Sequence, residues 1–172
     1  MNAVALTDHG KLYGAIEVYS ECRDAWLKPI VGYEVFVAPS RRTERVARRG
    51  AGRHLTLLAK NRTGCRNLVN MASAAFLEGY HYVLRIDREL LAALSEGLSC
   101  LSGCASSEFS EAILRDQLDE ATGLAHLRRR LLGKNFYFKG TVGTSSAAAP
   151  RPPSTSPTGS ACRWWTRATP TI

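Results

Sequence analysis

The sequence predicts an α/β domain with largely parallel strands, followed by a C-terminal segment without regular structure. Up to about Phe138, short apolar runs alternate with stretches whose apolar residues recur at helical spacing, as in strand–helix units. From Gly140 onward this periodicity stops and the chain contains no Asp or Glu, so residues 140–172 are predicted to be disordered. The periodicity is compatible with an open sheet and with a closed barrel.

The N-terminal part begins with a predicted strand, helix and strand. The apolar run Ala3–Leu6 predicts a short strand, which the turn-like Thr7–Gly10 ends. Apolar residues at helical spacing follow over Leu12–Trp26. Pro29 ends that predicted helix, and Ile30–Val37 predicts the next strand.

The alternation continues after an arginine-rich stretch that is predicted to be a loop. The last predicted helix is long and contains Gly123, which weakens it. The predicted elements are strand Leu55–Ala59, helix Leu68–Phe76, helix Ile86–Leu94, strand Leu98–Leu101, helix Ser107–Leu132 and strand Phe136–Phe138.

The charge balance is basic, with a net charge of +8 over 172 residues. This balance permits contact with nucleic acid but does not establish it. Solvated loop charges are one interpretation of the arginine-rich stretch, and a phosphate-binding surface is the other. The six arginines concerned are Arg41, Arg42, Arg45, Arg48, Arg49 and Arg53.

The cysteine content and the hydropathy predict a cytoplasmic protein. The five cysteines are odd in number and lack the spacing of a disulfide framework, which favours reduced thiols. No apolar run approaches the roughly 20 residues that a membrane-spanning helix needs. Asp8 and His9 interrupt the N-terminus before a signal-peptide core can form.

Five residues with metal-ligand chemistry follow or interrupt the predicted strands. Asp8 and His9 come after the first strand, where α/β proteins build sites, although a capping Asp beside an ordinary His is equally compatible. Glu34 lies inside an apolar strand, so it either faces solvent or has a cationic partner or a metal. His54 precedes a strand, and Cys104 follows one, where it is either a thiolate ligand or a packing residue.

The sequence lacks the motifs of several other kinds of active site. It contains no phosphate-binding loop, no dinucleotide fingerprint and no nucleophile elbow. It also contains no helical His-x-x-x-His pair and no paired Cys-x-x-Cys knuckles. His81 and His126 have unremarkable surroundings and are not proposed as site residues.

Read together, the motifs resemble the PHP domain of bacterial DNA polymerase III alpha subunits. The resemblance runs from about Ala3 to Phe138. The segments that carry it are Ala3–Gly10 with Leu12–Ala15, Lys28–Pro39, His54–Asn61, Phe76–Gly79, Arg85–Asp87 and Leu101–Cys104.

The resemblance implies a distorted β/α barrel, incomplete at both ends, with metal ions, zinc or manganese, at its mouth. His9, Glu34, His54 and Cys104 then fall on metal-binding positions, with Asp8 adjoining. It also implies DNA replication as the parent function, nucleotidyl transfer in later domains, DNA and other replisome subunits as partners, and 3′-exonuclease activity in some members. No catalytic residue is assigned.

The sequence departs from the family pattern in three places. A His-x-His element before Ala3 and an Asp-x-His element beyond Phe138 are missing, and Leu84 stands where a proline is usual. We therefore expect residues 1–139 to be a partial PHP domain, unstable and inactive by itself. The segment 140–172 is either a flexible linker or, as we hypothesise, an out-of-frame tail. A stand-alone PHP phosphoesterase and a non-enzymatic remnant are the alternative functions.

Overall fold

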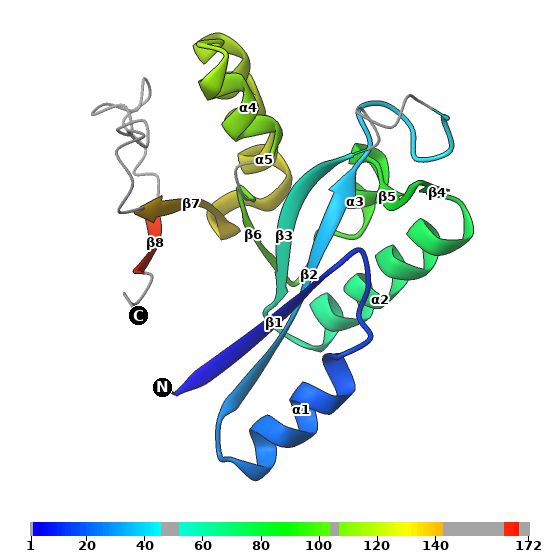
Figure 1. Ribbon diagram of the computed structural model, residues 1–172, viewed down its shortest axis with the longest axis vertical. Helices are drawn as coiled ribbons and strands as arrows, with labels where there is room; N and C mark the ends of the chain where they lie inside the picture. Colours follow the sequence, from blue (N-terminus) through cyan, green and yellow to red (C-terminus); the bar gives the residue numbers. More distant parts are fainter. Residues whose placement is uncertain (1, 46–51, 104–106, 143–163, 169–172) are drawn as a thin grey trace.

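The computed structural model describes residues 2–45, 52–103, 107–142 and 164–168 (Figure 1). Eight strands and five α-helices lie within these residues. The strands are β1 Ala3–His9, β2 Lys28–Val37, β3 Arg53–Ala59, β4 Tyr80–His81, β5 Val83–Ile86, β6 Leu98–Leu101, β7 Phe136–Val142 and β8 Trp164–Ala168. The helices are α1 Ala15–Asp24, α2 Arg62–Leu77, α3 Arg88–Ala93, α4 Glu108–Leu114 and α5 Leu118–Leu132, and the 3-10 turn Gly133–Asn135 follows α5.

The long strand β2 organises a mixed sheet. One of its edges pairs with β1 and then, further along, with β5, both in parallel. Its other edge pairs with β3, which runs antiparallel to β2 and also to β6. β7 follows parallel to β6, and β8 pairs with β7. The fold is therefore α/β as expected, but the expectation of largely parallel strands is wrong for β3.

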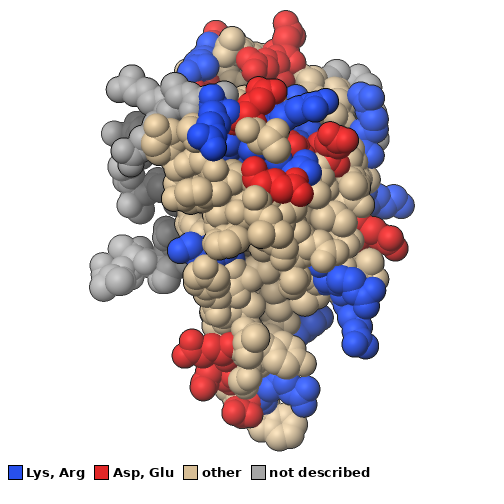
Figure 2. Space-filling model, turned by 90° about the vertical axis from the view of Figure 1, so that its right-hand side faces the viewer, with Lys and Arg blue, Asp and Glu red and all other residues tan. Residues whose placement is uncertain are grey.

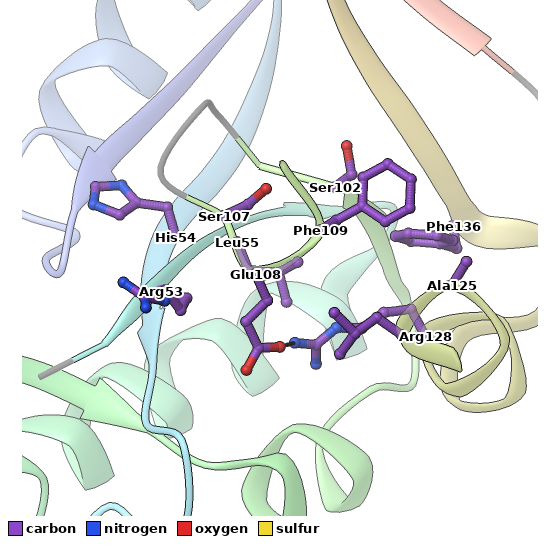
Figure 3. Close-up of a pocket in the computed structure, with 11 residues that line it drawn as sticks. Arg53, His54, Leu55, Ser102, Ser107, Glu108, Phe109, Ala125, Arg128 and Phe136 are labelled. Carbon is purple, nitrogen blue, oxygen red and sulfur yellow. Dashed lines mark hydrogen bonds and ion pairs between the residues drawn. The ribbon is translucent and has the colours of Figure 1, made fainter. Parts of the chain in front are cut away.

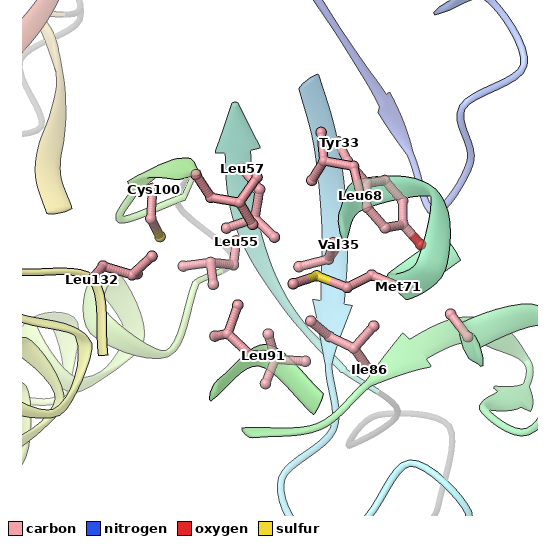
Figure 4. Close-up of a cluster of buried hydrophobic side chains, with 13 residues drawn as sticks. Tyr33, Val35, Leu55, Leu57, Leu68, Met71, Ile86, Leu91, Cys100 and Leu132 are labelled. Carbon is pink, nitrogen blue, oxygen red and sulfur yellow. The ribbon is translucent and has the colours of Figure 1, made fainter. Parts of the chain in front are cut away.

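The core lies between β2, β3 and the helices α2 and α3 (Figure 4). Tyr33, Val35 and Val37 are fully buried on one face of β2, as the alternation of the sequence predicted. Leu68, Met71 and Ala75 of α2 pack against this face with Leu91 of α3. The opposite face of β2, which carries Glu34 and Phe36, is left for other contacts.

Several element boundaries differ from the predicted ones because backbone pairing extends beyond the apolar residues. Thr7–His9 pair with Gly32–Glu34 and belong to β1, so the turn begins only at Gly10, whose φ is +67°. His54 lies inside β3 opposite Phe36. Strands β4 and β5 were not predicted, and Ile86 ends β5 while the following helix begins at Arg88.

The predicted helix Ser107–Leu132 is interrupted. It divides into α4 and α5 at residues 115–117, where Asp116 has a φ of +58°. Gly123, expected to weaken the helix, lies inside α5. In Figure 1 α4 extends away from the sheet, with α5 at its base.

Part of the C-terminal segment lies outside the described residues. Within the described part, β7 continues to Val142 and pairs with β8, so two stretches beyond Gly140 have strand structure. The boundary between two regions at Gly140 remains a prediction. No helix in the described residues combines the length and apolar character needed to span a bilayer.

Candidate metal centre

Three adjacent strands bring His9, Glu34 and His54 together. His9, the last residue of β1, is aligned with Glu34 of β2. His54 of β3 is aligned with Phe36, two residues beyond Glu34 and therefore on the same face of the sheet. The core occupies the other face, so the cluster lies on the side that α2 leaves uncovered.

The Glu34 carboxylate is shared by both imidazoles. Its Oε1 lies 2.6 Å from His54 Nδ1 and 3.1 Å from His9 Nε2. One donor atom from each of the three residues lies within 4.8 Å of the others. The Glu34 side chain is 10% exposed and that of His9 61%, so the cluster is buried at the carboxylate and open to solvent at His9.

Neighbouring groups fix the orientation of the two imidazoles. The ring of Phe36 meets the His54 ring edge to face, with centroids 4.6 Å apart. The His9 and His54 rings are also perpendicular, with centroids 5.4 Å apart. The backbone N–H of Gly10 donates to the carbonyl oxygen of Glu34 at 2.8 Å, which holds the end of β1 against β2.

The other two predicted metal residues are not part of this described cluster. Asp8 precedes His9 in the strand, so its side chain lies on the opposite face. Its Oδ2 accepts a hydrogen bond of 3.0 Å from the backbone N–H of Gly14 and so anchors the turn before α1. Cys104 lies outside the described residues, three residues beyond the end of β6.

Two arginines of the arginine-rich stretch form ion pairs with carboxylates. Arg42 Nη2 lies 2.6 Å from Glu78 Oε2, and its Nη1 lies 2.9 Å from Asp87 Oδ2. Burial lowers the pKa of Arg42, but the bonds to these two carboxylates outweigh it and raise the pKa above its usual value. Arg53 pairs with Glu111. Arg41 and Arg45 are exposed, whereas Arg48 and Arg49 lie outside the described residues.

The surface around this stretch does not carry a single sign of charge. Figure 2 shows the face with α2 and the loop before β3, where basic and acidic side chains are interspersed at one end. The contacts of Arg42 and Arg53 agree with this mixture. Arg41 and Arg45 are the exposed arginines among the described members of the stretch.

A second polar cluster, which no sequence motif indicated, lies near the His54 end of β3. A cavity there is lined by residues of β3, α4 and α5, among them Arg53, His54, Glu108 and Arg128 (Figure 3). Arg128 is the first of three consecutive arginines near the end of α5. It is 5% exposed because α5 turns it toward Glu108 of α4, a contact that depends on the unpredicted break between these helices.

Comparison with known proteins identifies the family of the chain. A model of the PHP domain matches residues 1–139, which include all three residues of the cluster. The chain belongs to the PHP domain family. The motifs that suggested this family in the sequence, from Ala3–Gly10 to Leu101–Cys104, all lie within the matched residues.

The relatives of this PHP chain are bacterial replication proteins. The DNA polymerase III subunit alpha of Thermus aquaticus is 44% identical over 142 residues, which cover 80% of this chain and 12% of the relative. That of Chlamydia pneumoniae is 50% identical over 115 residues, covering 66% and 9%. That of Treponema pallidum is 42% identical over 139 residues, covering 79% and 12%. The chain therefore spans only about a tenth of the length of these relatives.

The PHP cluster offers a donor set of two imidazole nitrogens and one carboxylate oxygen. Zinc and manganese both accept these ligand types. Three protein ligands with solvent on one side are typical of a site that keeps an open coordination position. The open side here is that of His9.

Proposed function

We propose that this chain is the PHP region of a bacterial DNA polymerase III alpha subunit and that His9, Glu34 and His54 bind one divalent metal ion, zinc or manganese. The convergence of their donor atoms within 4.8 Å, from three different strands, is the observation that carries the proposal. The identity to polymerase alpha subunits over two thirds or more of the chain favours this function over a stand-alone phosphoesterase.

The spacing of the donor atoms fits a metal ion. Ligand atoms around a tetrahedral zinc ion lie roughly 3.3 Å apart, because each metal–ligand bond is about 2.0 Å long. The 2.6 and 3.1 Å separations between Glu34 and the two histidines approach this value. An increase of about 0.7 Å in the His54–Glu34 separation would bring it to this value and make room for the ion.

The protein residues around the ion would have distinct roles. A bound divalent ion would supply Lewis-acid chemistry, activating water and holding a phosphate oxygen. Glu34, buried and central, would hold both imidazoles in position, and Phe36 would restrict rotation of the His54 ring. His9, at the exposed side, would border the approach of a ligand from solvent.

We further propose the setting of this site in the whole subunit. The sheet would close into a distorted β/α barrel with the cluster at its mouth, Cys104 would join the ligands, and Asp8 would support the adjoining turn. Arg41 and Arg45, with Arg48 and Arg49, would contact DNA phosphates. DNA replication in the cytoplasm, with DNA and other replisome subunits as partners, would be the function of the intact polymerase.

The isolated chain is proposed to lack polymerase and exonuclease activity. Nucleotidyl-transfer residues belong to other regions of the relatives, and three described ligands are too few for a cluster of several metal ions. Metal binding, rather than turnover, is therefore the property to measure.

Titration of the purified, chelator-treated chain with Zn²⁺ and Mn²⁺ by calorimetry tests the proposal. We expect one ion per chain, and at least about tenfold weaker binding in Glu34→Gln, a loss of about 1.4 kcal/mol. His126→Ala is the matched control, because His126 is an exposed residue of α5. Equal affinities of Glu34→Gln and the wild type would show the proposed site to be wrong.

A further inference from the structure

Helix α4 places two carboxylates against four arginines. Glu108 Oε1 lies 3.2 Å from Arg88 Nη2, and Glu108 Oε2 lies 3.0 Å from Arg128 Nη2. One turn further along α4, Glu111 pairs with both Arg53 and Arg115. Each carboxylate is therefore shared by two guanidinium groups, and positive charge exceeds negative charge in the group.

Arg128 is the buried member of this group. Its side chain is 7% exposed, and Nη1 is buried without a hydrogen-bond partner. A buried guanidinium N–H without an acceptor is unfavourable, because its hydration has been lost without replacement. Arg128 can therefore donate a further hydrogen bond through Nη1 to an anionic oxygen, in addition to its bond to Glu108.

A small cavity lies next to Arg128. Arg53, Glu108 and Arg128 line this cavity, and its free space is about 10 Å³, enough for one water-sized group. Arg53 and His54 are consecutive in β3, so the Arg53 side chain lies on the face of the sheet opposite the His54 ring and the metal cluster. A phosphate group bound by Arg128 and Arg53 therefore needs the space that the Glu108 carboxylate occupies.

Helix α4 is weakly attached to the rest of the molecule. It packs mainly against α5, and it contributes no residue to the main hydrophobic core (Figure 1). The ion pairs of Glu108 and Glu111 are thus a substantial part of what joins α4 to β3 and α3. Competing anions weaken such partly exposed pairs.

We propose that Arg128, Arg88 and Arg53 form a binding site for phosphate groups, and that Glu108 occupies this site in the structure described here. In the ligand-bound protein a phosphate oxygen takes the place of the carboxylate, and the guanidinium groups bind it through charge-assisted hydrogen bonds. The identity of the phosphate carrier, a nucleic-acid strand, rests on the proposed function; the arginine site itself does not.

Phosphate-dependent stabilisation tests this site directly. The full chain is heated in EDTA, in potassium phosphate or in potassium chloride of equal ionic strength, and the dissociation constant for phosphate is derived from the shift in Tm. We expect phosphate to stabilise the wild type, and Glu108→Gln to bind it about tenfold more tightly because the competing carboxylate is gone. Glu21→Gln, an exposed substitution in α1, is the matched control and should bind phosphate as the wild type does.

The arginine substitutions complete the test. Arg88→Gln removes a half-exposed partner and should weaken phosphate binding without preventing folding, whereas Arg128→Met should abolish it if that variant folds. Identical phosphate responses of Glu108→Gln, Arg88→Gln and Glu21→Gln would overturn the proposal. Since EDTA removes metal from the assay, failure of the metal site leaves this result unaffected.

A 5′-phosphorylated oligothymidylate then identifies the carrier. If this strand competes with inorganic phosphate, and competes more strongly in Glu108→Gln, the phosphate carrier is a nucleic acid. Phosphate binding without competition by the strand would overturn the assignment to nucleic acid.

Discussion

Replacement of Asp87 by alanine should loosen the attachment of the arginine-rich stretch, at Arg42, to the start of α3. Asp87 is 3% exposed, and its carboxylate accepts three hydrogen bonds. Its Oδ1 accepts from the backbone N–H of Leu90 at 2.9 Å and caps α3. Its Oδ2 accepts from the backbone N–H of Arg42 at 3.0 Å and from Arg42 Nη1 at 2.9 Å.

The cost of Asp87→Ala follows from these contacts. Loss of a helix N-cap costs about 1 kcal/mol. Removal of one partner from a buried ion pair costs roughly 3–5 kcal/mol, but Arg42 keeps Glu78 as a second partner, so the lower part of that range applies. The free energy of unfolding should therefore fall by about 3–4 kcal/mol. Asp87→Asn keeps an oxygen for the cap and should lose about 1–2 kcal/mol.

Urea unfolding followed by circular dichroism measures these differences. Asp24→Ala, at the exposed end of α1, is the control and should change the free energy by less than about 0.5 kcal/mol. A loss below 1 kcal/mol in Asp87→Ala would refute the inference that Asp87 and Arg42 hold the loop, and would return Arg42 to the candidates for phosphate binding.

Three further results follow from the same structure. Burial raises the pKa of Asp87, but the hydrogen bonds from Leu90 and Arg42 outweigh it and hold the pKa below its usual value. The contribution of Asp87 to the stability of the fold is therefore complete above about pH 4 and is lost as pH falls below that. The free energy of unfolding of Asp87→Asn should therefore depend less on pH in acid than that of the wild type. Met71→Ala, fully buried between α2 and the sheet, should lower the free energy of unfolding by about 2–5 kcal/mol in the same urea assay, against less than 1 kcal/mol for exposed Val69→Ala. Substitution of Arg41 and Arg45 by alanine should reduce the salt dependence of oligonucleotide binding by about one unit of slope each, measured by fluorescence anisotropy, and an unchanged slope would exclude these arginines from the interface.

The sequence allowed the buried face of the sheet to be predicted well. Alternation along Tyr33–Val37 separated the core face from the face with Glu34, because successive strand residues point to opposite sides. The family resemblance then selected His9, Glu34 and His54, which the structure brings together. Asp8, the immediate neighbour of His9, lies on the opposite face for the same geometric reason.

Long-range features were not predictable in the same way. β3 runs antiparallel to β2, and the sequence of residues 38–52 between them contains no helical pattern that would require a crossover. The break between α4 and α5 has no Gly or Pro to mark it, because Asp116 adopts the positive φ itself. The positions of Arg42, Arg53 and Arg128 follow from partners 20 to 58 residues away in sequence, on elements whose packing determines each pair.

Binding of a metal ion by His9, Glu34 and His54 can be seen by anomalous diffraction at the zinc absorption edge, from crystals grown with Zn²⁺. We expect an anomalous peak within about 2.0–2.2 Å of all three donor atoms. A zinc peak at another position in the chain, with the Glu34 carboxylate still bonded only to the two imidazoles, would contradict the proposed metal site.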